Sequence, residues 1–320
     1  MKSFAAIFYF LFSAGLLFAA PEKNASVQLD FSGAPEPGKT YFFNVRNIRT
    51  QNCELKYLGV RRIPARRDSS ETVLAGMLSY VSKSDDGHGI RREFICRIDS
   101  LSGAVNGRRL EFPELTGCSL HVTAGPGARC SMKLTSDKAA EEEQAARELL
   151  EGGSSAGTPV LSPEAEMLLR PVFTSVPESV SAYLGTQRTF ERGEKYPVAM
   201  GMLVQALRQR KIPAEAAKID AFAEYAGTTL FYGFPVCRVD LLAQGNGIPG
   251  YDFKLEVSLF MPAEADFPKC GPVRISRKAM EVVNSYLPEG GALIAGGKFE
   301  VVSNDMTDLV LIPADRLKSK

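Results

Sequence analysis

The sequence of 320 residues is poor in the groups that most often carry chemistry: it has two histidines, no tryptophan and no C-x-x-C pair. His88 and His121 are too few for a histidine-based metal centre, so we expect no metal site and no cofactor. The 38 basic and 37 acidic side chains nearly cancel. Because nucleic-acid binding needs a basic field to displace counterions, this balance argues against a nucleic-acid partner.

The chain also lacks long apolar runs, except at its N-terminus. Lys2 is followed by an apolar stretch from Phe4 to Phe18 and then by Ala19-Ala20-Pro21. A basic residue, a short apolar core and small residues at its end are typical of a secretory signal peptide. The run is shorter than the roughly 20 residues that span a bilayer. Residues 1–20 are therefore predicted to be cleaved, which leaves a secreted or periplasmic protein with no transmembrane segment.

Six cysteines follow the predicted cleavage point: Cys53, Cys96, Cys118, Cys130, Cys237 and Cys270. An even number in an exported chain predicts a structural disulfide framework. If the pairing respects the repeat described next, Cys53 bonds Cys130 and three arrangements of the other four cysteines remain. We favour Cys96–Cys118 with Cys237–Cys270, because each of these bridges closes a short local loop. The alternative bridges are Cys118–Cys130 and Cys53–Cys96.

An internal repeat is the clearest pattern in the sequence. Arg92-Glu-Phe-Ile-Cys-Arg-Ile-Asp99 returns as Gly233-Phe-Pro-Val-Cys-Arg-Val-Asp240. Three further pairs occur in the same order: Arg62-Ile-Pro-Ala65 with Lys211-Ile-Pro-Ala214, strands ending at Tyr80 and Tyr225, and helices opened by Ser162 and Ser276. Four ordered matches indicate a tandem duplication.

Local signals place the helices. Ser162-Pro163-Glu164 supplies an N-cap hydroxyl, a proline at the first helical position and an acid near the positive helix end. The apolar residues Ala165, Leu168, Leu169 and Val172 then recur at helical spacing. A second helix is expected from Pro197, a third after Ser276, and a short one over residues 52–59. An Ala/Glu-rich stretch closed by Gly and Ser, at about 135–158, is typical of a surface insertion.

These patterns predict an α+β fold of two tandem repeats, each an antiparallel β-sheet with helices on one face, stabilised by disulfides. A polar leader over 21–40 would precede repeat unit 1 at 41–195, which contains the insertion. Repeat unit 2 would cover 196–320.

Candidate catalytic residues are few. Asp99 and Asp240 recur in both repeats and are the best candidates for a carboxylate pair, although Arg97 and Arg238 beside them favour structural ion pairs. Ser119 and His121 would share one face of a strand, but no G-x-S-x-G elbow surrounds the serine.

Three further stretches resemble ligand-binding motifs but do not match them fully. Asp85-Asp86-Gly87 lacks the alternating acids of a calcium loop. The glycine-rich stretch from Gly290 to Lys298 lacks the first glycine and the Ser/Thr of a phosphate loop. The basic segment Arg61–Arg67 is most simply a solvated charged loop.

The sequence therefore favours an exported, non-enzymatic protein that acts as a binding or structural module. Its partner would be an unknown protein, a glycan or an apolar ligand. The alternative is an extracellular or periplasmic hydrolase that uses Asp99 and Asp240.

Overall fold

A computed structural model describes residues 26–33, 35–57, 61–85, 90–125, 130–135, 161–175, 180–209, 212, 215, 218–245, 247–264, 267, 271–286 and 297–317. The predicted signal peptide and nearly all of the predicted insertion lie outside these residues. No helix among them is both long enough and apolar enough to cross a membrane.

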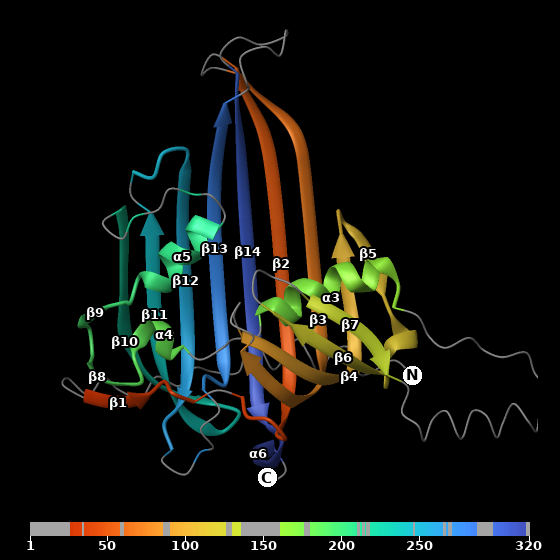
Figure 1. Ribbon diagram of the computed structural model, residues 1–320, viewed down its shortest axis with the longest axis vertical. Helices are drawn as coiled ribbons and strands as arrows, with labels where there is room; N and C mark the ends of the chain where they lie inside the picture. The colour runs from red at the N-terminus through yellow and green to blue at the C-terminus, as the bar shows by residue number, and fades with distance from the viewer. Residues whose placement is uncertain are drawn as a thin grey trace, which may run out of the picture.

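One large antiparallel sheet dominates the described structure (Figure 1). Eleven strands follow the order β7-β6-β4-β3-β2-β14-β13-β12-β11-β10-β9, and β5 pairs with β4 to make twelve. A separate two-stranded sheet joins β1 to β8. The strands are β1 (Ser26–Asp30), β2 (Thr40–Tyr57), β3 (Arg61–Asp85), β4 (Ile90–Val105), β5 (Arg108–Glu111), β6 (Ser119–Ala124), β7 (Cys130–Thr135), β8 (Gln187–Glu191), β9 (Lys195–Pro197), β10 (Ile219–Phe231), β11 (Phe234–Gly245), β12 (Tyr251–Pro262), β13 (Arg274–Tyr286) and β14 (Gly297–Pro313).

Strand formation follows the alternation of side chains. In β2, Tyr41, Phe43, Val45 and Asn47 are buried, while the residues between them are at least partly exposed. Successive strand side chains point to opposite faces, so this period of two buries one face of the sheet. We call the buried face, which carries Phe43, the helix side, and the other face the opposite side.

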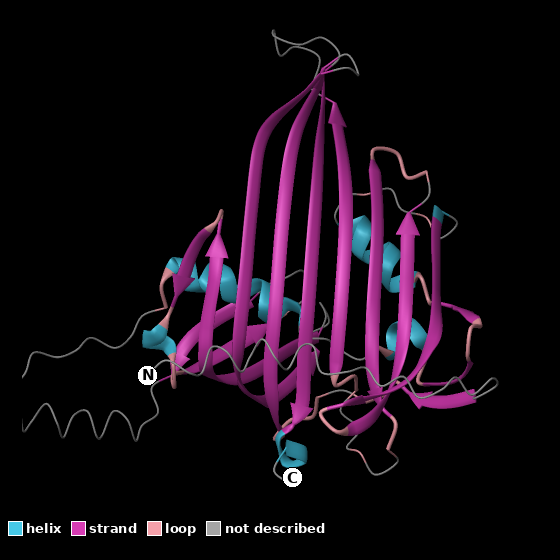
Figure 2. Ribbon diagram, turned by 180° about the vertical axis from the view of Figure 1, so that it is seen from behind, coloured by secondary structure: helices cyan, strands magenta, loops and turns pink. Residues whose placement is uncertain are grey.

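Among the described residues the helices are short and few: α3 (Pro163–Ser175), α4 (Ser181–Leu184), α5 (Gly201–Gln209) and α6 (Ala314–Leu317), with one 3₁₀ turn at Pro113–Leu115. In Figure 1 α3 and α5 lie in front of the sheet, and in Figure 2 they lie behind it. The predicted start of α3 is confirmed, because the Ala165 amide donates to Ser162 Oγ at 3.2 Å.

The packing of α3 on the sheet is close. Phe173 stacks on Phe43 of β2 with ring centroids 6.1 Å apart, and Thr72 Oγ1 of β3 donates to the Leu168 carbonyl at 3.2 Å. A Cβ added at Gly103 of β4 would lie 2.7 Å from Leu168 Cδ1, so glycine at this position permits the close approach.

The buried apolar side chains of the described residues form two separate cores. The first lies beneath α3 and is built mainly from β2, β3, β4, β6 and β14, and it continues to Phe234 and Val236 of β11. The second lies among α4, α5, β1 and β8 on one side and β10, β11 and β12 on the other. Each core covers part of the helix side, so a stretch of that face between and beyond them is left without apolar cover.

The two ends of the long strands differ. Beyond the helices, β2, β3, β13 and β14 continue as a tall extension of the sheet (Figure 1). At the other end the sheet curls. The ring centroids of Phe42, on β2, and Tyr232, in the β10–β11 turn, are 6.3 Å apart. In the sheet order, however, β14, β13, β12 and β11 lie between β2 and β10.

The predicted fold class is wrong. The described chain is mostly strand, and its main sheet is continuous, whereas two α+β repeats with a sheet each were expected. Ser276 does not open a helix but lies within β13, and residues 52–57 belong to β2. The proposed boundaries of the repeat units, at 41–195 and 196–320, stay a prediction.

The predicted disulfide framework is also wrong for the described cysteines. Cys53, Cys96, Cys118, Cys130 and Cys237 are all free thiols, and Cys270 lies outside the described residues. The register explains why. Cys53 on β2 and Cys130 on β7 are four strand spacings apart, or about 19 Å along the sheet, whereas bridged Cα atoms lie within about 7 Å. Cys96 faces Leu120, so it is also out of register with Cys118.

Candidate ligand-binding groove

The two carboxylates predicted as catalytic candidates do not meet. Asp99 is exposed on β4, at a bulge between the paired residues Ile98 and Ser100. Asp240 lies on β11, six strands away in the sheet order, and its carboxylate is bound by Arg238 and Ser258. The Arg238 Nε atom donates to Asp240 Oδ1 at 2.8 Å, which is the structural ion pair expected from the sequence. The geometry thus provides no carboxylate pair from these two residues.

Ser119 and His121 do share one face of β6, as predicted, but their surroundings do not form a catalytic triad. The residues directly opposite His121 are Ile95 and Lys133, so the register places no carboxylate against the imidazole. Ser119 is buried opposite Arg97 and Thr135. A base needs an orienting acid on its far nitrogen, and neither neighbouring strand provides one at the opposite position.

Other predicted candidates fall outside the described residues: His88, Asp86-Gly87 and nearly all of the stretch from Gly290 to Lys298. The basic segment around Arg66 is part of β3, not a loop. Within the described part of the chain, no group of three or more His, Cys, Asp or Glu side chains could hold a metal ion.

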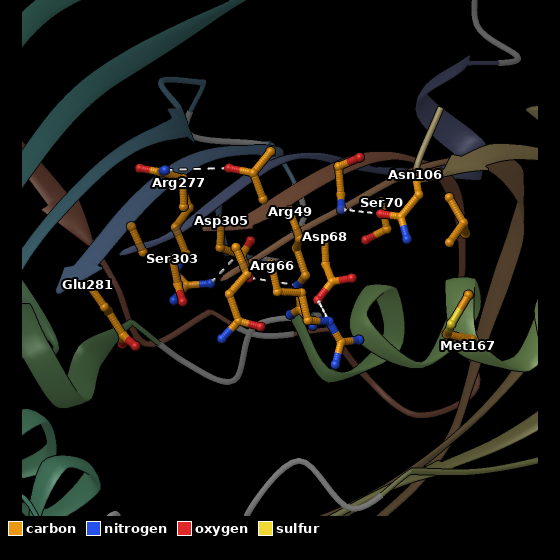
Figure 3. A pocket seen from close by; sticks show the side chains of 16 residues that line it. Arg49, Arg66, Asp68, Ser70, Asn106, Met167, Arg277, Glu281, Ser303 and Asp305 are labelled. Atoms are coloured by element: carbon orange, nitrogen blue, oxygen red, sulfur yellow. Dashed lines mark hydrogen bonds and ion pairs between the residues drawn. The ribbon is translucent and has the colours of Figure 1, made fainter. Parts of the chain in front are cut away.

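A groove of about 560 Å³ lies on the helix side, where the four long strands extend past α3 (Figure 3). Ligand pockets in proteins typically have volumes of about 300–1,000 Å³. Its floor is formed by β2, β3, β13 and β14. One wall is lined by Met167 of α3, Val105 of β4 and Asn106 of the β4–β5 turn. The lining residues are Arg49, Thr50, Gln51, Arg66, Asp68, Ser69, Ser70, Val105, Asn106, Met167, Arg277, Ala279, Glu281, Ser303, Asn304 and Asp305.

Asp305 of β14 organises the lower end of this floor. Its Oδ2 atom lies 2.8 Å from Arg49 Nε, and its Oδ1 atom accepts a hydrogen bond from Asn47 Nδ2 at 3.0 Å. Arg277 Nη1 approaches the same Oδ1 atom, but only to 4.0 Å. These side chains come from three neighbouring strands, because Arg49 is directly opposite Asp305, and Arg277 is opposite Thr307.

Beneath the groove, a row of buried polar residues crosses the sheet. Thr72, Asn47 and Thr307 are directly opposite one another on β3, β2 and β14, and each is at most 5% exposed. Asn47 Nδ2 donates to Thr307 Oγ1 at 2.8 Å as well as to Asp305. Buried polar groups require such partners, so this network fixes the orientation of the Asp305 carboxylate.

The charges of the groove cancel as a whole. Arg49, Arg66 and Arg277 face Asp68, Asp305 and Glu281, and Arg66 has its own partner in Asp68 at 2.5 Å. Much of the remaining lining is uncharged and polar, and none of the described lining residues is aromatic. Such a surface can exchange hydrogen bonds with a polar ligand but offers little to an apolar one or to a polyanion.

Of the residues that line this groove, the sequence patterns had singled out only Arg66, in the basic segment Arg61–Arg67. The only available signal was the polar alternation Arg49, Gln51 on β2 and Asp305, Ser303 on β14, in strands whose other ends alternate apolar residues. A change from apolar to polar residues on the face that is buried elsewhere marks the point at which the core ends.

No protein-family model and no curated protein matches the chain. Among solved structures it is similar to a Bacteroides fragilis protein described as exported, with a YmcC-like fold; the identity is 11%, the TM-score is 0.19, and 86% of this chain and 98% of that chain are covered. Pseudomonas aeruginosa OpdQ is 6% identical with a TM-score of 0.20, covering 86% and 98%. The Pseudomonas putida toluene transporter TodX is 8% identical with a TM-score of 0.14, covering 87% and 90%.

By their own descriptions, these similar structures include an exported protein and a monoaromatic hydrocarbon channel. TM-scores this low carry no argument about this chain. Export of the protein therefore continues to rest on its N-terminal sequence.

Proposed function

We propose that the protein is an exported, non-enzymatic binding module that holds a glycan in the groove on the helix side of its sheet. The observation that supports this proposal is the groove itself: about 560 Å³ in volume, lined mainly by polar side chains, with acids and bases in balance. The N-terminal sequence supports export.

A glycan fits this lining better than the apolar ligand that the sequence analysis also considered. Sugar hydroxyls both donate and accept, and the floor offers both kinds of group in Gln51, Ser70 and Ser303. An apolar ligand would leave these groups dehydrated and unpaired, at a cost of about 1–3 kcal/mol each. Met167, Val105 and Ala279 are the apolar lining residues, and they are too few to offset that cost.

The test is binding of the purified full chain to a printed array of neutral and acidic oligosaccharides. Ser303 lies at the centre of the floor, between Gln51 and Glu281 on the neighbouring strands. The variant Ser303→Phe should fill the groove and abolish the signal. The matched control is Met306→Phe on the same strand, where the side chain is 44% exposed on the opposite side.

Binding that survives in Ser303→Phe, or that is lost equally in Met306→Phe, would place the ligand elsewhere and contradict the proposal. A blank array with the unmodified protein would remove the glycan as the ligand class. The melting temperatures of both variants show whether the substitutions leave the fold intact.

A further inference from the structure

Arg277 is the cation of the groove whose hydrogen-bonding capacity is least used. Its guanidinium carries five N–H donors, yet it makes no hydrogen bond to any residue in the described part of the chain. The 4.0 Å from Arg277 Nη1 to Asp305 Oδ1 is too long for one. Asp305 cannot easily supply a closer contact, because Asn47 and Arg49 already donate to its two oxygens.

The lower end of the groove therefore carries an uncompensated positive charge. Two guanidinium groups, from Arg49 and Arg277, share the single carboxylate of Asp305, whereas Arg66 is matched by Asp68. The Asn47 network holds Asp305 in place from below, so the carboxylate is not free to turn towards Arg277. At 40% exposure, the Arg277 side chain is open to a ligand.

The floor above Arg277 presents uncharged polar side chains. Gln51, Ser70 and Ser303 present uncharged groups, and their side chains form no hydrogen bond with any residue that the structure describes. Ser303 is four residues along β14 from Thr307, the partner of Arg277, so it is about 13 Å away along the strand. The groove thus has a cationic lower end, whereas the floor above it holds uncharged polar groups beside the carboxylates of Glu281 and Asp68.

On the assumption of the proposed function, we infer that the ligand is an acidic saccharide whose carboxylate binds Arg277. The planar guanidinium matches a carboxylate with two parallel N–H···O bonds, and Arg49 beside it adds to the field. Hydroxyl groups of the same chain then bind Gln51, Ser70 and Ser303. A single uncompensated charge suits one carboxylate at this position. A ligand with a dense row of anionic groups would also meet the carboxylates of Asp68, Glu281 and Asp305.

The experiment compares neutral tetrasaccharides that carry one terminal galacturonic, mannuronic or guluronic acid with their methyl esters by isothermal titration calorimetry at low salt. Esterification removes the charge and leaves the hydroxyls. The unmodified protein should bind at least one acid about tenfold to a hundredfold more tightly than its ester, as expected for one charge-assisted hydrogen-bonded contact. Added salt should weaken acid binding and leave ester binding nearly unchanged.

The variant Arg277→Gln should remove this preference for the acid while it retains the ester affinity. The control is Arg238→Gln on the opposite side of the sheet, whose arginine is 47% exposed and also faces a carboxylate. Equal affinity for acid and ester, or a preference that Arg277→Gln does not reduce, would overturn the inference. In that case binding of esters that Ser303→Phe abolishes would leave the proposed function standing. Failure of all six probes together with a blank array would end both proposals.

Discussion

Replacing Arg274 of β13 by alanine should destabilise the protein more than any other loss of an arginine–carboxylate pair on the opposite side. Arg274 lies at the curled end of the sheet, where its Nε and Nη2 atoms each donate to Asp308 of β14 at 2.9 Å. Its guanidinium also lies 5.7 Å from the ring centroid of Phe231 and 5.2 Å from that of Phe260. One side chain thus connects the β10–β11 hairpin, β12, β13 and β14.

The magnitude follows from these contacts. Arg274 and Asp308 are 28% and 30% exposed, so their bidentate pair is worth about 1 kcal/mol, at the upper end for surface pairs. Two cation–π contacts add about 0.5–1 kcal/mol each. The expected loss for Arg274→Ala is therefore about 2–3 kcal/mol. Arg274→Lys keeps the charge and loses the planar fork, so its effect should be intermediate.

Urea unfolding measures the effect as a shift of the midpoint at constant slope. Because the chain has no tryptophan, tyrosine fluorescence and far-UV circular dichroism are the two probes, and their agreement checks for two-state unfolding across both cores. Arg238→Ala is the matched control: its pair with Asp240 is 47% and 38% exposed, so it should cost less than about 1 kcal/mol. An Arg274→Ala effect no larger than that of Arg238→Ala would refute the reasoning.

Two further predictions concern the first core. Burial and, to a smaller extent, the nearby Asp99 charge together raise the pKa of the Cys96 thiol from 9.0 to about 12. The folded state therefore keeps a proton that the unfolded state releases above pH 9, so the free energy of unfolding should fall between pH 9 and 12 by up to about 1.4 kcal/mol per pH unit. The urea midpoint of Cys96→Ala should fall less steeply over this pH range. Equal slopes for the variant and the unmodified protein would show that Cys96 does not cause the fall. Leu168→Ala should cost about 2–5 kcal/mol of stability because the Leu168 side chain is 1% exposed. Met167→Ala is the control and should cost less than about 0.5 kcal/mol, because that side chain is 47% exposed. Similar urea midpoints for the two variants would show that Leu168 does not anchor α3 to the sheet.

Sequence patterns predicted the elements whose signals are local. The α3 helix is specified by Ser162, Pro163 and the apolar positions that follow within ten residues, and all four of those positions are buried. The same apolar spacing misled at β13, where Ala279 and Val283 also match a helix. There the neighbouring strands β12 and β14 decide the outcome, since both edges of β13 are hydrogen-bonded along its length. Such tertiary pairing overrides local preference and cannot be read from a single segment.

The disulfide prediction and the groove show the same limit. An even count of cysteines is a property of composition, whereas a bridge requires a short distance that only the register sets. The groove depends on Asn47 meeting Asp305, which is 258 residues further along the chain. No local motif encodes that contact. The sequence could predict which faces are polar but not which polar faces become neighbours.

The pairing of β2 with β14 has a consequence for how the protein reaches this structure. The two central strands are separated by almost the whole chain, as the 260 residues between Asn47 and Thr307 show. Contacts between distant segments slow folding because a long loop must close before they contribute. As the chain emerges from the ribosome, β2 and β3 are complete long before β14 exists. The long edge of β2 therefore waits unpaired during synthesis, when it can recruit other strands, and a chaperone that shields this edge would raise the yield of native protein.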